Sequence, residues 1–416
     1  MGTQTEMSTY RRIERRVRLK TSIFLYSLIL KRLVRKVARR RPVRVMFYVN
    51  NLSMWKNDKL LMLLKEDSRF EPIVVSLLYP RDSLSRKKDL EEELLTHFNK
   101  MGVDCLSGFN FKKNKTLPAS IFKADIVFFP QPYINNLKDI PFNALLSYIP
   151  YGFSIEDSPI FHNSLYQNIC WKYFAVSSLQ KEMKVKYNYN HGANVIVSGD
   201  PLADYFLDGH TPSCSNWAID DPKLKRIIWA PHHSISSTDW LNRANFLKIA
   251  DDMLETARKY KDKVQFVFKP HPMLKDKLYK NDSWGPEKTD AYYDAWNAMP
   301  NTRLADGNYV DLFITSDAMI HDCSAFTAEY LYVNKPVMYV TEKERIESFN
   351  SFADECFQVH YHGSSIRDIE TFIDNVINGN DPLLKERTAL VKEKLLPKGD
   401  ETTAGNIYKE LCKIFE

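Results

Sequence analysis

The chain has 416 residues, of which 44% are hydrophobic and 13% aromatic, so a disordered or fibrous protein is excluded and the length fits two globular domains. Its net charge is +6, yet thirteen basic residues and one acid lie between residues 11 and 41, which leaves the remainder slightly acidic. This distribution argues against a nucleic-acid-binding body and indicates a basic attachment segment at the N-terminus.

Residues 1–41 form that segment, and "RRVRLKTSIFLYSLILKRLVRKVARR" within it is predicted to be one helix. An apolar stripe recurs along it at spacings of three and four: Ile23, Tyr26, Leu30, Leu33, Val34 and Val37. From residue 31 onward the opposite face is basic, with Arg32, Arg35, Lys36 and Arg39, whereas Leu25 and Leu28 fall outside the stripe.

An amphipathic helix of this kind suits the headgroup region of an anionic membrane. The alternatives are that it packs on the protein's own body or binds a partner. Its mostly apolar run 23–30 is too short to cross a bilayer, which takes roughly 20 residues. Six cysteines without metal spacing and the lack of a secretory signal indicate reduced thiols. We therefore expect a peripheral protein at the cytoplasmic face of the cell membrane.

From residue 42 to 206 apolar strands alternate with helices. Strands are predicted at 43–50, 72–78, 124–130, 145–152, 172–178 and within 194–204. Helices are predicted at 54–66, 86–102 and 178–187. Strands that are apolar throughout and alternate with helices are typical of a parallel, doubly wound sheet.

Residues 207–222 lose this periodicity and gather Gly, Ser, Pro and Asp, which indicates a linker between domains. The alternation then resumes through residues 223–400, and a last helix is expected at 401–416. Strands are predicted at 225–231, 264–272, 317–322 and 336–340, and helices at 238–260, 287–299, 364–378 and 383–394. We therefore predict an α/β protein with two Rossmann-like, doubly wound domains that face a central cleft.

Polar residues follow three strands of the second half, where open parallel sheets bind their ligands. The sets are His232, His233 and Ser234; Lys269 and His271; and His321, Asp322, Cys323, Ser324 and Thr327. Four of the chain's 10 histidines lie in these sets. This concentration is the strongest sign of a site in the sequence.

A pyrophosphate fits these strand ends. A helix that begins near Ser324 offers backbone N–H groups, Ser324 is expected to cap it, and Lys269 and His271 add charged hydrogen bonds. A plain N-cap and a stiff proline turn are the alternatives. Glycine-rich dinucleotide, phosphate-loop, HExxH and GxSxG patterns are all missing, which disfavours a dehydrogenase, an NTPase and a catalytic metal. We predict no metal ligands and no required cofactor, and leave a divalent cation open.

In the first half, "YIPYGFSIEDSPIFHN" (148–163) combines aromatic and polar residues. Tyr151 and Gly152 are expected on the acceptor side, facing the phosphate site. A transferase must deprotonate the acceptor hydroxyl, and Glu156, Asp157 and His162 are the candidate bases. Loop capping is the alternative for each of them.

Several segments resemble the CDP-glycerol glycerophosphotransferase family, the teichoic-acid-polymerase-like enzymes. They are "VIVSGDPLADYF", "IIWAPHHS", "FKPHP", "DLFITSDAMIHDCSAFTAEYLYVNKPVMYV" and "KGDETTAGNIYKEL", in order over roughly residues 140–415. The resemblance implies a GT-B fold that binds its nucleotide donor in the C-terminal domain. It also implies transfer of glycerol phosphate from CDP-glycerol to a hydroxyl of a lipid-linked or polysaccharide acceptor at the inner membrane face.

Carried over by residue, the resemblance implies that His271 and Ser324 contact the donor phosphates and that Asp322 orders their loop, with Asp311 in the loop before it. The chain departs from the family pattern at three places. Tyr151 stands where the family's Trp-His-Gly motif has its proposed base, Ala325 replaces a serine, and His232-His233-Ser234 replaces Thr-Trp-Arg.

Our sequence-based hypothesis is a membrane-peripheral transferase that builds a teichoic-acid-like or capsule-like polymer. An acceptor hydroxyl attacks the β-phosphorus of the donor in line, and CMP leaves. A nucleotide-sugar glycosyltransferase of the same fold and a membrane-recruited scaffold without activity are the alternatives.

Overall fold

The computed structural model describes residues 2–79, 82–132, 141, 143–207, 210–236, 244–305, 307, 309–341, 349–397 and 402–416. They pack into two compact units. Unit 1 comprises Met1–Gly152, Ser158–Asp204 and Pro397–Glu416, and unit 2 comprises Phe153–Asp157 and Tyr205–Leu396. The chain therefore enters unit 2 briefly at 153–157 and ends in unit 1.

Unit 1 contains a seven-stranded sheet in the order β3-β2-β1-β6-β7-β8-β9, in which neighbouring strands are parallel. Its strands are β1(Val43–Val49), β2(Phe70–Ser76), β3(Cys105–Leu106), β6(Ile126–Phe128), β7(Leu145–Tyr148), β8(Lys172–Ala175) and β9(Val195–Val197). The central strand β1 pairs Val45 with Pro72 on one side and with Ile126 on the other. A small hairpin of β4(Phe109–Asn110) and β5(Lys115–Thr116) lies outside the sheet.

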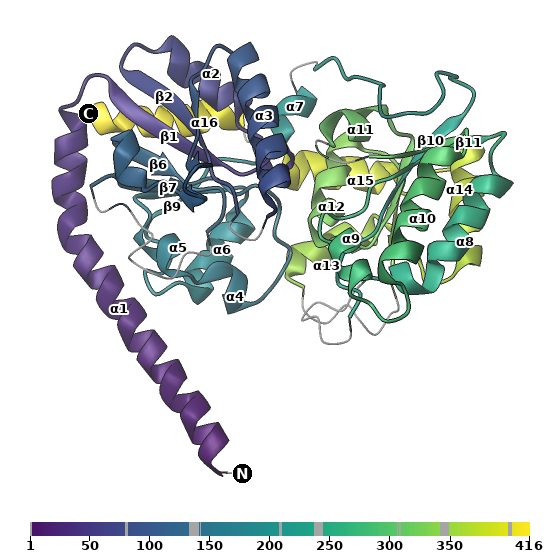
Figure 1. The fold of residues 1–416 in the computed structure, drawn as a ribbon, viewed down its shortest axis with the longest axis horizontal. Coiled ribbons are helices and arrows are strands. Elements are labelled where there is room, and N and C mark those ends of the chain that lie inside the picture. Colours follow the sequence, from purple (N-terminus) through teal and green to yellow (C-terminus); the bar gives the residue numbers. More distant parts are fainter. Residues whose placement is uncertain are drawn as a thin grey trace. The chain divides into compact units, whose positions relative to one another are not determined.

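Unit 2 contains a six-stranded sheet in the order β12-β11-β10-β13-β14-β15, again parallel between neighbours. Its strands are β10(Lys225–Ala230), β11(Val264–Phe268), β12(Thr302–Leu304), β13(Ala318–His321), β14(Val337–Val340) and β15(Tyr361–Gly363). Two parallel sheets with alternating helices confirm the predicted doubly wound α/β class (Figure 1).

Helices cover both sheets. Unit 1 has α1(Gly2–Ala38), η1(Leu52–Met54), α2(Asp58–Glu66), α3(Leu84–Lys100), η2(Ala119–Phe122), α4(Pro159–His162), α5(Leu165–Ile169), α6(Ser178–Tyr187), α16(Thr403–Cys412) and η7(Lys413–Phe415). The short α7(Ala203–Leu207) spans the point where the chain passes into unit 2. Unit 2 has α8(Phe246–Lys259), α9(Leu274–Tyr279), α10(Gly285–Ala298), α11(Val310–Thr315), α12(Ser324–Glu329), η4(Tyr330–Val333), α13(Ser351–Gln358), α14(Ile366–Ile377), α15(Leu384–Leu390) and η6(Val391–Leu395).

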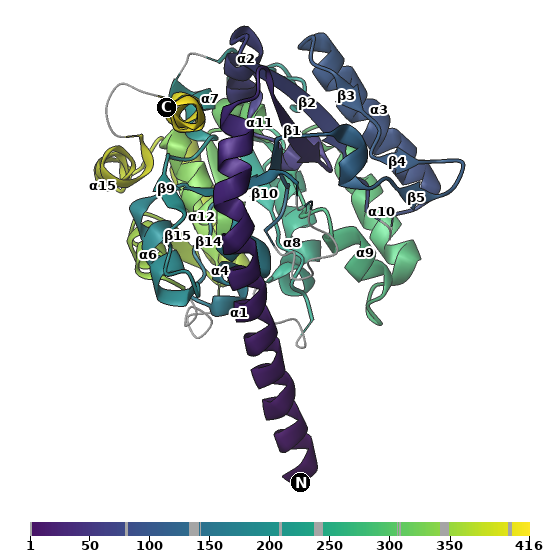
Figure 2. The same cartoon turned by 90° about the vertical axis from the view of Figure 1, so that its left-hand side faces the viewer.

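The first helix corrects one expectation. The apolar stripe of α1 packs on the cores of unit 1: Tyr26, Leu33 and Val37 are buried, with Ile23, Leu30 and Val34 packed beside them. The stripe therefore covers the protein's own body and is not available to lipid. The opposite face carries exposed Val17, Phe24, Leu25 and Leu28, and the N-terminal turns of α1 extend past the rest of unit 1 (Figure 2). Among the helices that the structure describes, none combines the length and apolarity needed to cross a bilayer.

The strand order of each sheet reverses once near its centre. In unit 1 the reversal falls between β1 and β6, and in unit 2 between β10 and β13. Open α/β sheets bind ligands outside the carboxyl ends of their strands at such a reversal. In unit 2 the predicted residues His232, Asp322 and Ser324 follow the two strands at this point.

Candidate functional site

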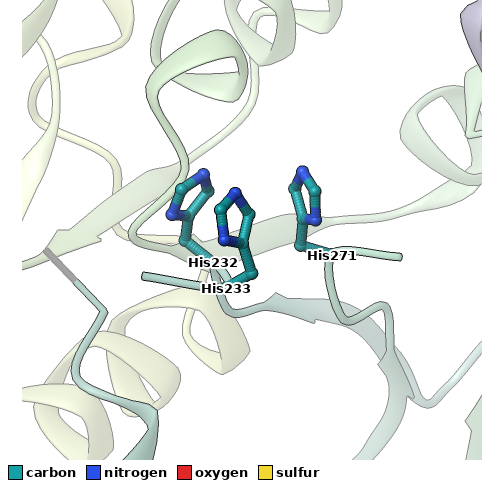
Figure 3. A group of neighbouring side chains, drawn as sticks. All are labelled: His232, His233 and His271. Atoms are coloured by element: carbon teal, nitrogen blue, oxygen red, sulfur yellow. The ribbon is translucent and has the colours of Figure 1, made fainter. Parts of the chain in front are cut away.

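Three histidines gather at the carboxyl ends of β10 and β11. Backbone bonds beyond the strands, from Lys269 N–H to Trp229 O at 2.8 Å and from His271 N–H to Pro231 O at 3.0 Å, hold the two loops side by side. The ring centroids of His233 lie 4.2 Å from those of both His232 and His271. The three rings stand next to one another and point the same way (Figure 3). The structure therefore brings together residues 39 positions apart, as their places at strand ends predicted.

A core of aromatic residues packs at the ends of the two strands that carry these loops. Trp229, the penultimate residue of β10, stacks on Phe268, the last residue of β11, at a centroid distance of 4.9 Å. Phe246 and Trp296 pack on the same pair and are fully buried. Large rings that interdigitate in a core leave little freedom to the strand ends, so the histidines start from a rigid base.

The hydrogen bonds of two imidazoles indicate which nitrogen carries the proton. Nδ1 of His232 accepts the N–H of Ser234 at 3.2 Å, and Nδ1 of His271 accepts the N–H of Met273 at 3.1 Å. Burial, aided by the neighbouring His233 and Lys269, lowers the pKa of His271 to about 3. A neutral imidazole that accepts at Nδ1 has its proton on Nε2. His232 and His271 therefore offer Nε2–H donors.

The hydrogen bonds of the imidazole nitrogens indicate whether the cluster suits an anion or a metal ion. Ligand nitrogens of His232, His233 and His271 all lie within 4.8 Å of one another, a spacing that a divalent cation can also use. A metal-bound histidine, however, normally donates a proton from its other ring nitrogen. Here that nitrogen accepts a backbone N–H in two of the three rings. The hydrogen bonds therefore favour an anion, such as a phosphate, over a metal ion.

Asp322 connects separate segments of the site by hydrogen bonds. Its carboxylate is buried and accepts the N–H of His232 at 2.6 Å and the N–H of Asn245 at 2.7 Å. Asn245 Nδ2 in turn donates to Val340 O at 2.7 Å. One carboxylate thus joins the loop after β10, the start of α8 and the end of β13. Sequence reasoning missed Asn245, because the predicted helix 238–260 placed it inside a helix; residues 238–243 lie outside the described chain, and α8 begins at Phe246.

The start of α12 differs from the prediction by one residue. Cys323 occupies the N-cap without a side-chain capping bond, and Ser324 is the first helical residue, so Ser324 does not cap the helix. The thiol of Cys323 instead donates to Ala230 O at 3.2 Å, which leaves it no role as a cap. Thr327 is buried and its hydroxyl donates to the carbonyl of the N-cap residue, Cys323 O, at 3.1 Å.

The structure also shows the surroundings of three further residues that were predicted on the donor side. Ser234 is buried and its Oγ lies 2.9 Å from His232 Nδ1. Lys269 is buried at the end of β11, which places an ammonium group beside His271. Asp311, on α11, pairs with His210 at 2.6 Å and accepts the N–H of Ser213 at 3.1 Å. It therefore orders the segment after α7, and within the described residues it makes no hydrogen bond to the histidine loops.

The predicted acceptor-side residues divide between the units. Tyr151, Gly152 and His162 belong to unit 1, and Glu156 and Asp157 to unit 2. Glu156 is buried in an isolated antiparallel bridge with Phe349. His162 is buried and stacks on Tyr187 at a centroid distance of 5.8 Å. Asp157 is half-buried.

The chain is similar to known proteins in sequence and in fold. The family model described as CDP-glycerol:poly(glycerophosphate) glycerophosphotransferase matches residues 147–413, more than half of the chain. Among curated proteins, none matches this sequence.

Solved structures share the fold. A histidine-to-asparagine variant of the wall teichoic acid polymerase TagF is similar with a TM-score of 0.60 and 11% identity, over 100% of this chain and 98% of that one. The same variant soaked with CDPG gives a TM-score of 0.58 and 12% identity, over 100% and 98%. The structure of MnaA from S. aureus with UDP gives 0.53 and 14%, over 89% and 96%. At such identities the likeness shows the fold, and it confirms the predicted GT-B-like architecture.

Proposed function

This chain belongs to the CDP-glycerol:poly(glycerophosphate) glycerophosphotransferase family, and on that premise we propose that it transfers glycerol phosphate, or a similar phospho-polyol, from a CDP-activated donor to a hydroxyl of a lipid-linked or polysaccharide acceptor. The product is a surface polymer of the teichoic acid or capsule type. The observation that carries the proposal is the set of imidazole N–H donors at the strand reversal of unit 2.

In the proposed reaction the acceptor hydroxyl attacks the β-phosphorus of the donor in line. The new P–O bond forms as the bond to the CMP oxygen breaks, and CMP leaves with that electron pair. The Nε2–H groups of His232 and His271, with the ammonium of Lys269, stabilise the charge that develops on the phosphate oxygens. Asp322 keeps the loop of His232 in place.

The hydroxyl proton goes to a carboxylate or imidazole of the segment 148–163. Asp157 is our first candidate, because it is half-buried and belongs to the same unit as the histidine cluster. Glu156 and His162 are buried, so either would need a local movement to reach an acceptor. The reaction needs no cofactor in this scheme.

We place the enzyme at the cytoplasmic face of the membrane. The support is the face of α1 that unit 1 leaves uncovered, where Phe24 and Leu28 are exposed and Arg32 and Arg35 follow on the same side. Apolar side chains beside basic ones suit an anionic lipid surface. A lipid-linked acceptor would then be presented at the surface that holds the enzyme.

Release of CMP tests the activity. The purified chain is incubated with a membrane extract and, in turn, with CDP-glycerol, a UDP-sugar and a GDP-sugar, and mass spectrometry identifies the released nucleotide and the product. We expect CMP from CDP-glycerol, and a loss of at least about a hundredfold in His271→Asn. His191→Asn, at an exposed histidine of unit 1, is the matched control.

The alternatives predict other outcomes. Release of UDP or GDP from a nucleotide sugar would make the chain a glycosyltransferase and overturn the donor assignment. Binding of CDP-glycerol with turnover no faster than in His271→Asn would leave a scaffold without activity.

A further inference from the structure

The segment 153–157 carries two candidate bases, the second of them Asp157, and the backbone of this segment is bound to unit 2. The residues on either side of it belong to unit 1. The backbone N–H of Asn350 donates to Ile155 O at 2.8 Å, and its side-chain Nδ2 donates to Ser154 O at 3.3 Å. The position of Asp157 is therefore set within unit 2, although the next residue along the chain is part of unit 1.

A buried carboxylate holds the first residue of this segment. Glu329, the last residue of α12, is 1% exposed, and its Oε1 accepts the N–H of Phe153 at 3.0 Å. Its Oε2 accepts the hydroxyl of Tyr309 at 2.5 Å. The ring of Tyr309 packs on Phe313 and Phe326 at centroid distances of 4.8 and 5.0 Å. Burial of a carboxylate is costly unless donors reach it, and these two donors fix the orientation of Glu329.

Helix α12 connects this carboxylate with the loop that is proposed to bind the donor phosphates. The helix begins at Ser324 and ends at Glu329, and its six residues span about 9 Å at the rise of an α-helix. Asp322, two residues before the helix, accepts the N–H of His232. All of these residues belong to unit 2. One short helix therefore relates the backbone of Phe153 to the histidine cluster.

We propose that Glu329 is a positioning residue, whose carboxylate holds the segment 153–157 on unit 2 so that Asp157 can take the proton of the acceptor hydroxyl. Glu329 is not itself the base, because each of its oxygens accepts a donor of the protein. The catalytic part of this inference rests on the proposed function. The attachment of the segment rests on the hydrogen bonds alone.

Two variants of Glu329 test the role in turnover. Glu329→Ala removes the acceptor of the Phe153 N–H, whereas the amide oxygen of Glu329→Gln can still accept it. With CDP-glycerol and a membrane extract we expect kcat to fall at least about tenfold in Glu329→Ala, while the KM for CDP-glycerol stays unchanged. Glu329→Gln should recover most of this loss. A carboxylate that only stabilised the fold would lower the free energy of unfolding and leave kcat of the folded chain unchanged.

Ser316→Ala is the matched control for stability. It removes a buried hydroxyl of unit 2 that lies 2.7 Å from Tyr330 Oη, and it leaves the bonds of the segment 153–157 intact. We expect it to unfold more easily than the parent chain and to keep the parent's kcat. An equal fall in kcat in Ser316→Ala and Glu329→Ala would overturn the positioning role.

A double variant tests whether Glu329 acts through Asp157. Asp157→Asn alone should lower kcat at least about a hundredfold. Glu329→Ala added to it should lower kcat less than about twofold further, because the base that Glu329 positions is already lost. A further fall of tenfold would show that Glu329 acts without Asp157, and an unchanged kcat in Asp157→Asn would show that this aspartate is not the base. Either result would overturn the inference.

Hydrogen exchange measured by mass spectrometry on the intact chain does not depend on turnover. We expect the peptide that contains residues 153–157 to exchange at least about tenfold faster in Glu329→Ala, with peptides from β10 and β13 unchanged. If Glu329→Ala does not fold, Asn350→Asp replaces it in each measurement, because it keeps the oxygen that caps α13 and loses the amide donor to Ser154 O.

The outcomes separate this inference from the proposed function. Unchanged protection of the segment in a folded variant would show that Glu329 does not hold it, and the proposed transfer would stand. If no donor releases CMP from the parent chain, the proposed function fails, and hydrogen exchange alone then decides whether Glu329 holds the segment.

Discussion

At the scale of single residues, the histidine cluster has one buried and two half-buried rings, and backbone hydrogen bonds fix the tautomer of two of them. Nδ1 of His232 and of His271 is occupied by a backbone N–H two residues further on. Each imidazole therefore holds its position through the chain's own turn and turns its Nε2–H outward from that bond. Donors preorganised in this way stabilise phosphate charge without having to reorient.

This arrangement predicts donor binding that is nearly independent of pH. Because burial lowers the pKa of His271 to about 3, the ring stays neutral between pH 5.5 and 8.5 and its N–H donor is retained throughout. A histidine with the ordinary pKa of about 6.5 would lose its charge, and with it much of its affinity, across this range. Calorimetric titration with CDP-glycerol at four pH values measures the dissociation constant. A fall in affinity of about tenfold from pH 6 to 8 would contradict a neutral donor.

Lys184 allows a second residue-scale prediction, on stability. Its ammonium is buried under the ring of Tyr173, 4.6 Å from the centroid, and burial lowers its pKa to about 7. The unfolded chain, with a lysine pKa of about 10.4, binds a proton that the folded chain has released, so stability rises with pH between these values. The neighbouring thiol of Cys170 does not interfere, because burial raises its pKa far above this range.

We therefore expect the free energy of unfolding of the parent chain to increase by about 1 kcal/mol per pH unit from pH 7.5 to 9.5 relative to Lys184→Met. Urea unfolding at three pH values measures the difference. Parallel pH profiles for the two chains would show that Lys184 keeps its ordinary pKa.

Individual residues show where sequence reasoning succeeds and where it stops. His232, His233 and His271 were predictable as neighbours, because the carboxyl ends of adjacent parallel strands meet at one edge. The N-cap was not, since Cys323 and Ser324 are consecutive and only the backbone angles of Cys323 place the helix start at Ser324.

At the scale of elements, central strands were easier to predict than edge strands. β10 and β11 contain runs of apolar residues and appear where expected. Both edges of the same sheet were missed: β12(Thr302–Leu304) and β15(Tyr361–Gly363) have three residues each and polar side chains. An edge strand is covered on fewer sides, so its composition carries little of the apolar signal that identifies a buried strand.

Helix α1 carries apolar side chains on two faces, and only one of these faces is covered by the protein. The residues that recur at spacings of three and four pack on unit 1, while Phe24 is 62% and Leu28 61% exposed on the other side. The periodicity of the sequence identified the first set because that set extends over more turns of the helix. The second set falls outside the stripe in the sequence, and only the structure shows that it is uncovered.

We predict that this second face of α1 holds the enzyme on membranes. Phe24→Ser combined with Leu28→Ser should reduce binding to vesicles containing anionic lipid by at least about tenfold, because each buried large side chain contributes roughly 2 kcal/mol. Sedimentation with vesicles measures the bound fraction. Val185→Ser, at an exposed apolar residue on α6, is the control.

The charge of the lipid gives an independent check. Binding of the parent chain should weaken at high salt and on vesicles of neutral lipid, since Arg32 and Arg35 lie exposed along the same face. Binding that neither the serine pair nor salt reduces would assign this face of α1 to another partner, such as a second copy of the chain.

At the scale of the whole molecule, the class of fold followed from the alternation of strands and helices, but the path of the chain between units did not. The segment 153–157 joins unit 2 through the bond from Asn350 N–H to Ile155 O at 2.8 Å and that from Phe153 N–H to Glu329 Oε1 at 3.0 Å. These bonds join residues 195 and 176 positions apart, so they depend on tertiary packing. No local pattern in "YIPYGFSIEDSP" distinguishes them from a surface loop.

The C-terminal helix α16 is bound to unit 1 through "SGDPLAD", which is part of a segment that carries the family resemblance. Asp204, at the end of "SGDPLAD", accepts the N–H of Thr403 at 2.7 Å and the N–H of Ala404 at 2.8 Å, the first two residues of α16. Gly199 lies against the same place: its φ is +102°, and an added Cβ would approach Thr403 Oγ1 to 2.6 Å. Ile407 and Leu411 of α16 then fill the core of unit 1. This motif therefore joins two segments of one unit.

Asp204→Ala should accordingly lower the free energy of unfolding by about 3 kcal/mol, because it leaves two buried N–H groups without an acceptor. Gly199→Ala should destabilise through its strained backbone and its clash with Thr403. Denaturant unfolding of the intact chain measures both, with Asp220→Ala as the control, since that side chain is 98% exposed. The affinity of either folded variant for CDP-glycerol should equal that of the parent chain. A stable Asp204→Ala chain that no longer binds the donor would instead make this aspartate part of the binding site.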